Sequence, residues 1–240
     1  MRVFVNKISG IDDAIVSMFM SKRTWTRELE SEVRRICASV TKPDGSVDLE
    51  CNMEDYFKFK DWMEKLVKWG QKHVTMLRFI EFSITVEGLH RGGQDDWDAH
   101  AKRYENRIIR SSTRLSNFGY EMSDFYKGKI IPTDQAAEIL GITFPERFEH
   151  DGKAYVKAVN GYIDEQYKDN QDVKRGLYML SIPSNFIFKV NLTEWAHVYK
   201  ERNASGTANP EVKECCEAIA DELGKMVPWF DRTLFAAIEN

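Results

Sequence analysis

Residues 90–117 read HRGGQDDWDAHAKRYENRIIRSSTRLSN, and the rest of the fold depends on what this segment forms. Four arginines recur in it at steps of four, three and four residues: Arg103, Arg107, Arg110 and Arg114. This spacing is helical. It also gives a second, apolar face, made of Trp97, Ala101, Tyr104 and Ile108. We therefore predict a helix with one buried side and one cationic side.

Two interpretations of the cationic side are open. Arginine keeps its charge at any working pH and presents a planar fork of donors, so a row that ends at Ser111, Ser112 and Thr113 suits a phosphate group. Alternatively, the arginines form a solvated face that pairs with nearby acidic side chains, Asp95, Asp96, Asp98 and Glu105. The segment alone does not separate a binding site from a charged surface.

The flanking sequence predicts an α+β fold. Apolar residues alternate with polar ones at Ile80, Phe82, Ile84 and Val86, which is the pattern of a half-buried strand. Residues 2–9 and 186–190 predict two more strands. Helices are expected over residues 12–20, 27–39, 52–70, 155–167, 172–179, 193–202 and 211–226, with a short one from Thr133. We expect one helix-rich α+β domain, residues 1–240, with a small antiparallel or mixed sheet.

Capping residues support three of these helices. Asn52 stands before an apolar stripe of helical spacing, and Asn191 ends a strand with Glu194 three residues on, as in a capping box. Pro210 fits the first turn of the helix that follows it.

Composition excludes several classes of protein. The net charge of −4 argues against a general nucleic-acid binder, although a local basic pocket for a small anion is compatible with it. No segment approaches the roughly twenty apolar residues of a membrane span, and the N-terminus has no cleavage signature. The four cysteines show no CxxC spacing and are expected to be reduced thiols. We therefore expect a soluble, cytoplasmic protein.

The common catalytic motifs are absent from the sequence. It contains no Walker loop, no GxGxxG after a strand, no HExxH and no GxSxG. The five histidines are dispersed, so no metal site is predicted: His73, His90, His100, His150 and His197.

Two regions together resemble the flavin-dependent thymidylate synthases, which methylate dUMP with a flavin in place of a catalytic cysteine. The first region ends in Ser112-Thr113-Arg114, similar to the SxR that closes the family signature RHRxxSxNExSxRY. Most of that signature is rewritten, because its RHR falls on Lys102-Arg103-Tyr104 and its Asn-Glu on Ile109-Arg110.

The second region resembles the C-terminal pattern of the same family. Arg175, Asn191 and Arg202 match its arginine, its helix-opening asparagine and its helix-terminal arginine in spacing, and residues 208–212, ANPEV, are similar to its AQxEI. Thr193 stands where the family has a second arginine on the flavin side. The positions that hold the nucleotide are therefore kept, and the changes fall on the flavin side.

The resemblance implies a function and a set of site residues. The substrate, a pyrimidine deoxynucleotide monophosphate, would be held by Ser112, Arg114, Arg175 and Arg202. Arg202 would also be catalytic, since an arginine near the pyrimidine carbonyls stabilises charge that develops as C5 becomes nucleophilic. FAD would lie beside His73, Arg103, Arg110 and Asn191. NADPH and methylenetetrahydrofolate would be co-substrates, and the chain would form a homotetramer whose active sites use more than one subunit.

Other functions are open. A hydroxymethylase or an enzyme that acts on dCMP would need the same phosphate site. A nucleotide-binding derivative could have kept that site and lost the flavin. A structural or regulatory helical protein, with solvated arginines, would use neither.

Overall fold

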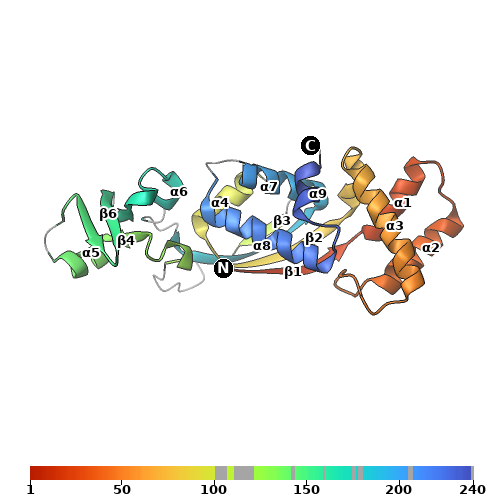
Figure 1. Cartoon of the computed structure of the whole chain (residues 1–240), viewed down its shortest axis with the longest axis horizontal. Helices are drawn as coiled ribbons and strands as arrows, with labels where there is room; N and C mark the ends of the chain where they lie inside the picture. The colour runs from red at the N-terminus through yellow and green to blue at the C-terminus, as the bar shows by residue number, and fades with distance from the viewer. Residues whose placement is uncertain are drawn as a thin grey trace.

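The computed structural model describes residues 1–100, 107–110, 122–141, 144–158, 160–174, 177, 181–204 and 208–238. The molecule is elongated, with three helices at one end, a helix-covered sheet in the middle and a smaller sheet at the other end (Figure 1). Over the ranges described, no helix is long and apolar enough to span a membrane. The helix-rich α+β class expected from the sequence is confirmed.

The central sheet is antiparallel, with the strand order β1-β2-β8-β3. Its strands are β1 (Arg2–Ser9), β2 (Glu81–His90), β8 (Pro183–Asn191) and β3 (Arg107–Arg110). In β2 the predicted alternation is confirmed, because Phe82, Ile84 and Val86 are fully buried and the residues between them are partly exposed. The strands predicted at residues 2–9 and 186–190 are β1 and β8.

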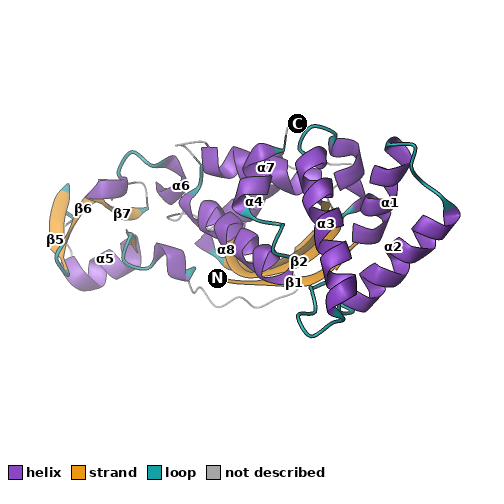
Figure 2. Ribbon diagram, turned by 45° about the vertical axis from the view of Figure 1, so that its right-hand side comes forward, coloured by secondary structure: helices purple, strands orange, loops and turns teal. Residues whose placement is uncertain are grey.

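Helices cover one face of this sheet (Figure 2). They are α4 (Arg91–His100), α7 (Leu192–Ala204) and α8 (Pro210–Met226), with α9 (Arg232–Ala237) packed on α7 and α8. Trp97 of α4 is buried against aromatic rings of β8 and α7, with centroid distances of 5.9 Å to Phe186, 5.0 Å to Phe188 and 5.9 Å to Trp195. This aromatic cluster fixes α4 on the sheet.

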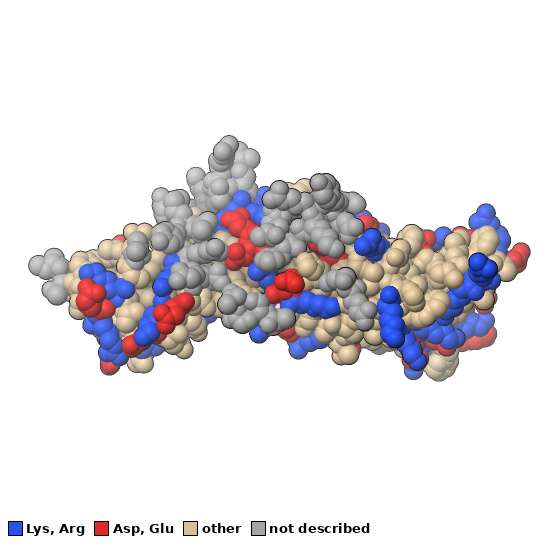
Figure 3. Space-filling view, turned by 90° about the horizontal axis from the view of Figure 1, so that it is seen from above, with Lys and Arg blue, Asp and Glu red and all other residues tan. Residues whose placement is uncertain are grey.

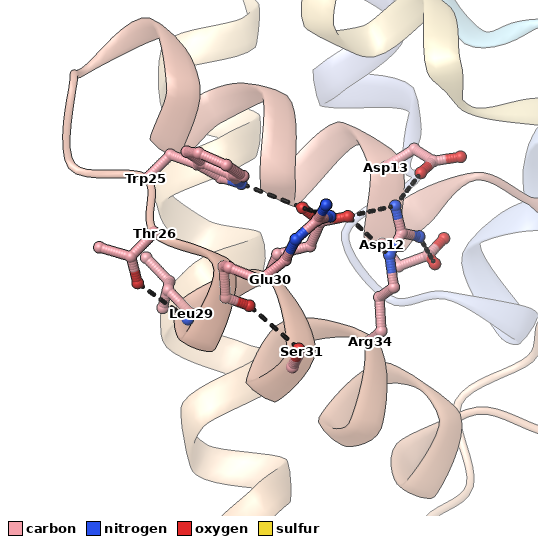
Figure 4. A network of polar contacts seen from close by, with 9 residues as sticks. Asp12, Asp13, Trp25, Thr26, Leu29, Glu30, Ser31 and Arg34 are labelled. Atoms are coloured by element: carbon pink, nitrogen blue, oxygen red, sulfur yellow. Dashed lines mark hydrogen bonds and ion pairs between the residues drawn. The ribbon is translucent and has the colours of Figure 1, made fainter.

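The helical end contains α1 (Ile11–Ser21), α2 (Arg27–Val40), α3 (Met53–Gly70) and the 3-10 helix η1 (Val74–Phe79). Asn52 caps α3 as predicted, since its Oδ1 accepts from the backbone amides of Glu54 and Asp55. Arg34 ties α2 to α1, with guanidinium nitrogens 2.8 Å from Asp12, 3.0 Å from Asp13 and 3.1 Å from Glu30 (Figure 4). Because the Arg34 side chain is 44% exposed, solvent screens this network.

A second antiparallel sheet, not predicted from the sequence, has the order β4-β7-β6-β5. Its strands are β4 (Ile130–Pro132), β7 (Gly161–Asp164), β6 (Lys153–Ala158) and β5 (Arg147–His150). One face packs Tyr155 and Tyr162 against α5 (Thr133–Leu140). The other face packs Ile130 and Ile163 against α6 (Gln171–Lys174) and η2 (Asp124–Tyr126), and η3 (Glu165–Tyr167) follows β7. The sheet therefore has an apolar layer on each side.

The predicted arginine helix is wrong at residues 107–110. α4 covers Arg91–His100, and residues 107–110 form β3, whose backbone pairs with residues 186–189 of β8. The β-branched pair Ile108-Ile109 favours a strand where a sheet edge offers hydrogen bonds, and this tertiary pairing outweighs the helical spacing. Arg107 and Arg110 therefore belong to a strand, and Arg103 and Arg114 lie outside the described residues.

The helix expected over residues 155–167 is also wrong. This part of the chain forms β6 and β7, joined through Asn160, which has a left-handed φ of 65°, and Gly161. A β-carbon on Gly161 would meet the carbonyl oxygen of Ile131 at 2.3 Å, so the turn needs glycine there. Of the helix expected over residues 172–179, the structure shows α6, and most of the remainder lies outside the described residues.

Charged side chains of both signs are interspersed over the described part of the face drawn in Figure 3. No single broad basic area dominates that face, as the net charge predicts.

Candidate functional site

The predicted site residues that the structure describes fall into two groups. His73 and Asn191 lie where the central sheet meets the helical end of the molecule. There, Asn191 of β8 pairs with Glu81 of β2, which follows η1. Arg110 pairs with Phe186, five residues from Asn191 along β8, or about 17 Å away for a strand. Arg202 lies near the far end of α7, about 16 Å from Asn191 for a helix. Ser112, Arg114, Arg175 and Arg103 lie outside the described residues.

Arg202 is a buried cation, with 7% of its surface exposed. One guanidinium Nη donates to the backbone carbonyl of Asp96 in α4, and Nε has no hydrogen-bond partner. Among the residues that the structure describes, no carboxylate forms an ion pair with Arg202. Burying a charge without an opposite charge costs several kilocalories per mole, so this guanidinium is suited to receive an anion or a carbonyl oxygen.

Arg110 contacts the same helix, at the two residues before Asp96. Its side chain is half-buried, with Nη1 2.5 Å from the Asp95 carboxylate and Nη2 donating to the Gln94 carbonyl at 3.0 Å. The two arginines therefore approach three consecutive residues of α4, residues 94–96. The sequence predicted pairing with Asp95 as one of two interpretations, and for Arg110 that pairing is confirmed.

A chain of buried polar side chains runs beside Arg202. The Glu211 carboxylate accepts from Ser123 Oγ at 2.8 Å and from the His90 backbone amide at 3.2 Å, and its other close contact is His90 Nδ1. Asn209 Nδ2 lies 3.2 Å from His90 Nε2 and 3.3 Å from Asp96 Oδ2. His90 is fully buried, and Glu211, Ser123 and Asn209 are nearly so. The chain ends at Asp96, whose carbonyl holds Arg202.

Several buried polar atoms nearby have no hydrogen-bond partner. They are Arg91 Nη1, Gln94 Oε1, Ser184 Oγ and both side-chain polar atoms of Asn203. Arg91 and Gln94 begin α4, Ser184 pairs with Leu89 across β2 and β8, and Asn203 follows Arg202. Buried polar groups in native proteins are normally paired, so unpaired ones around one helix are consistent with a polar ligand that completes them.

His73 opens on a different cavity, of about 500 Å³. Its lining residues come from α1, the end of α3 and η1: Ser17, Ser21, Trp69, His73, Thr75, Met76 and Phe79. The His73 ring packs edge-on to Trp69 with a centroid distance of 5.3 Å, and Lys22 Nζ lies 3.9 Å above the Trp69 ring. The cavity therefore has aromatic walls, and Lys22, which is not one of the lining residues, places its cation on the ring of Trp69. Aromatic surface with a cation nearby suits a planar, anionic ligand.

Asn191 caps α7 as predicted. Its Oδ1 accepts from the Glu194 amide at 2.9 Å and from Thr193 Oγ1 at 2.7 Å. Thr193 stands where the resembled family has an arginine. It is buried, and its hydroxyl donates to the capping oxygen of Asn191. No guanidinium is available at that position.

Burial raises the pKa of all four cysteine thiols above the ordinary value. Burial raises the pKa of Cys37 to about 12 and raises the pKa of Cys215 and Cys216 well above the ordinary value. Burial also raises the pKa of Cys51. These thiols are protonated at neutral pH. In the described ranges, His, Cys, Asp and Glu side chains form no group of three that could hold a metal ion.

Sequence reasoning missed the buried polar chain. His90 and Glu211 are 121 residues apart, and Ser123 and Glu211 are 88 apart, so no local pattern joins them. The one available signal was Asn209 before Pro210 and Glu211, which marks a helix start with a polar cap.

Comparisons with known proteins give the family. The family described as "Thymidylate synthase complementing protein" (Thy1) matches residues 22–229. No curated protein matches the chain.

Solved structures give the fold. Two are flavin-dependent thymidylate synthase ThyX from Helicobacter pylori, each with FAD and dUMP. The first is 12% identical with a TM-score of 0.50 and covers 100% of both chains. The second is 13% identical with a TM-score of 0.54 and covers 98% of this chain and 100% of that one.

Proposed function

The chain belongs to the thymidylate synthase complementing protein family, and from this premise we propose that it methylates C5 of a pyrimidine deoxynucleotide, dUMP, with methylenetetrahydrofolate as the carbon donor. The observation that carries the proposal is Arg202, a buried guanidinium with an unpartnered Nε and no carboxylate paired with it in the described ranges. A nucleotide offers the negative oxygens that such a group needs.

The residues of this chain would divide the work as follows. Arg202 binds the nucleotide. Beside a pyrimidine carbonyl, its positive charge stabilises the negative charge that develops as C5 becomes nucleophilic. Ser112, Arg114 and Arg175 complete the phosphate site, as the resemblance implies. Because the described thiols are held protonated, no cysteine is assigned to attack C6.

Product analysis tests this function directly. The protein is incubated with dUMP or dCMP, together with FAD, NADPH and methylenetetrahydrofolate, and the nucleotides are analysed by mass spectrometry. We expect dUMP to gain one CH2 group. A hydroxymethylated product, or turnover of dCMP alone, would replace the methylase with one of the related reactions. Absence of any product would contradict the enzyme.

The cavity at His73 fits a flavin in its chemistry. Trp69 and Phe79 offer aromatic surface, His73 offers a ring nitrogen and Lys22 offers a cation. FAD bound there would supply the electrons for reduction of the transferred carbon, with NADPH as their source. Asn191 and Arg103 are the other residues that we propose on this side.

Arg110 is the weakest member of the predicted flavin set. It is paired with Asp95 and stands about 17 Å from Asn191 along β8. This pairing and the buried Thr193 favour the alternative, a nucleotide-binding relative without flavin, and FAD binding decides between them.

His73→Ala is expected to weaken FAD binding about two- to tenfold, because an aromatic contact contributes roughly 0.5–1.5 kcal/mol. Binding is followed by quenching of flavin fluorescence in the presence of dUMP. The matched control is His150→Ala on the second sheet, which should leave the affinity unchanged. Equal affinity in both variants would remove His73 from the flavin site, and no saturable quenching in the unmodified protein would support the flavin-free alternative.

The outer face of the central sheet is a candidate contact between copies of the chain. Phe4, Thr85, Ile187 and Ile109 are aligned across the four strands, and Ile109 is 74% exposed. Three of these four side chains are exposed and apolar, namely Phe4, Ile187 and Ile109, and exposed apolar side chains aligned on one sheet face are suited to association. We propose that it is buried in the homotetramer.

The molar mass from light scattering at micromolar concentration is expected to be that of a tetramer. Ile109→Asp should lower this molar mass, because association would bury and desolvate the new carboxylate. Ile139→Asp, at an exposed position of α5, is the control. A clean monomer from the unmodified protein would contradict shared active sites.

A further inference from the structure

We propose that Asn209 is a positioning residue that, together with His90 and Glu211, holds Asp96 and through it Arg202 in the orientation that binds the nucleotide. The inference rests on the proposed function of Arg202. It assigns a role to a buried polar chain that the proposed reaction does not otherwise use.

The amide of Asn209 is fully engaged, and its orientation is fixed by the helix that it caps. Oδ1 accepts from the amides of Glu211 at 3.0 Å and Val212 at 3.5 Å. The amide nitrogen therefore points away from α8, 3.2 Å from His90 Nε2 and 3.3 Å from Asp96 Oδ2. Two acceptor contacts and two donor contacts use the whole hydrogen-bonding capacity of the side chain.

This orientation of the Asn209 amide determines which ring nitrogen of His90 carries a proton. Asn209 Nδ2 can only donate, so His90 Nε2 must accept and carry no proton. The ring proton then sits on Nδ1 and is donated to Glu211. Glu211, as a carboxylate, receives three donors: His90 Nδ1, the His90 amide and Ser123 Oγ. Each donor and acceptor in the chain is matched in this one arrangement.

Asp96 transmits the arrangement to Arg202. The same residue offers its carboxylate to Asn209 and its backbone carbonyl to Arg202. Arg202 has no carboxylate paired with it in the described ranges, so its contact with Asp96 is what aims the guanidinium. Three helices meet here: the middle of α4 through Asp96, the last turn of α7 through Arg202 and the N-cap of α8 through Asn209.

Asn209→Asp isolates the donor function of the amide. The two side chains have nearly the same size, and aspartate is as good an N-cap, so α8 keeps its cap. The substitution removes both donors and directs a carboxylate oxygen at His90 Nε2 and at the Asp96 carboxylate. At high pH these acceptors repel, and the link to Arg202 is lost.

The variant also acquires a pH dependence with a definite sign. The new carboxylate, His90 Nε2 and the Asp96 carboxylate would then face one another with no donor between them. The other ionisable groups near this cluster are Glu211, Tyr126, edge-on to the His90 ring at 4.9 Å, Lys129, which acts electrostatically on Glu211, and Arg202, which donates to the Asp96 carbonyl. A proton taken up between the facing acceptors would supply the missing donor. The link is therefore restored at low pH, where that proton is bound, and lost as pH rises.

The experiment is calorimetric titration of the full-length protein with dUMP from about pH 6 to pH 8.5, the range in which histidine titrates. At the highest pH of this range, we expect Asn209→Asp to bind dUMP about tenfold more weakly than the unmodified protein does. At the lowest pH, its affinity for dUMP should approach that of the unmodified protein. Titration of the dUMP phosphate is common to both proteins and cancels in the ratio. The control is Asn52→Asp, the same change at the cap of α3, which should follow the unmodified protein at every pH. A ratio that stays constant with pH would overturn the proposal.

A second measurement does not depend on the nucleotide. In protein labelled with 15N-histidine, His90 should show the tautomer protonated on Nδ1, and its ring nitrogen signals should shift in Asn209→Asp. In protein labelled with 15N-arginine, the Arg202 Nε–H signal, assigned by its loss in Arg202→Lys, should shift in Asn209→Asp. If these signals behave as expected while the unmodified protein does not bind dUMP, the proposed function fails and the positioning of Arg202 stands. An Nε2-protonated His90, or an unmoved Arg202 signal, overturns the positioning itself.

Discussion

Arg202→Ala is expected to weaken dUMP binding by about a hundredfold or more. A hydrogen bond to a charged group contributes on the order of 1.5–3 kcal/mol, and the guanidinium has more than one donor to give, since Nε is unpartnered. Because each 1.4 kcal/mol corresponds to about a factor of ten, loss of two such bonds exceeds a hundredfold. Calorimetric titration of the purified protein with dUMP measures the change.

Two variants make this result specific. Arg202→Lys keeps the charge and loses the planar fork, so we expect affinity between that of Arg202→Ala and that of the unmodified protein. Arg232→Ala removes a surface arginine that pairs with Glu217 and Asp221, and it should leave binding unchanged. Circular dichroism confirms that each variant is folded. Unchanged affinity in folded Arg202→Ala would mean that Arg202 does not hold the nucleotide.

Trp97→Ala is expected to lower the free energy of unfolding by about 3–5 kcal/mol, the usual cost of removing a large buried aromatic side chain. Trp97 is 1% exposed and packs on Phe186, Phe188 and Trp195, so little of the cavity can close. Since this ring anchors α4, which carries Asp96, the variant should also lose dUMP affinity. Urea denaturation at fixed protein concentration gives the stability change.

Trp25→Ala is the matched control. Trp25 is 38% exposed, and its indole nitrogen donates to Glu30 at 3.2 Å at the surface of the helical lobe. We expect it to cost no more than about 1 kcal/mol. Similar losses in the two variants would contradict the assignment of the Trp97 cluster as the anchor of α4.

Much of the fold could be predicted from the sequence, because the elements concerned are specified locally. Strand β2 alternates at period two, α3 and α8 have asparagine caps, and the predicted cap Asn191 directly precedes α7. In each case the signal lies within a few residues of the element. Such signals survive in any tertiary setting that leaves one face buried.

The errors arose where a distant partner decides the structure. Arg107 and Arg110 keep a helical spacing, yet β3 forms because β8 offers it a free edge. The second sheet was missed because its strands are only three to six residues long and carry weak alternation. Short segments of this kind depend on their neighbours in the sheet.

The candidate site shows the same division. Capping by Asn191 could be predicted, and Arg202, which was singled out by the resemblance to the family's C-terminal pattern, lies buried. That Arg202 is held by Asp96, and Asp96 by Asn209, could not be predicted, because those contacts join residues 106 and 113 positions apart. His90 looked like one dispersed histidine among five, and only the fold brings it to Glu211.

The hydrogen bond between Ser123 and Glu211 connects the second sheet to the helices that cover the central sheet. Ser123 precedes η2 and β4 of the second sheet, and Glu211 lies in the first turn of α8. If Ser123 moved away from Glu211, the Glu211 carboxylate would keep only the two donors of His90, its backbone amide and its ring Nδ1. The attachment therefore joins the second sheet to Arg202 through a continuous series of buried contacts: Ser123 to Glu211, Glu211 to His90, His90 to Asn209, Asn209 to Asp96 and Asp96 to Arg202.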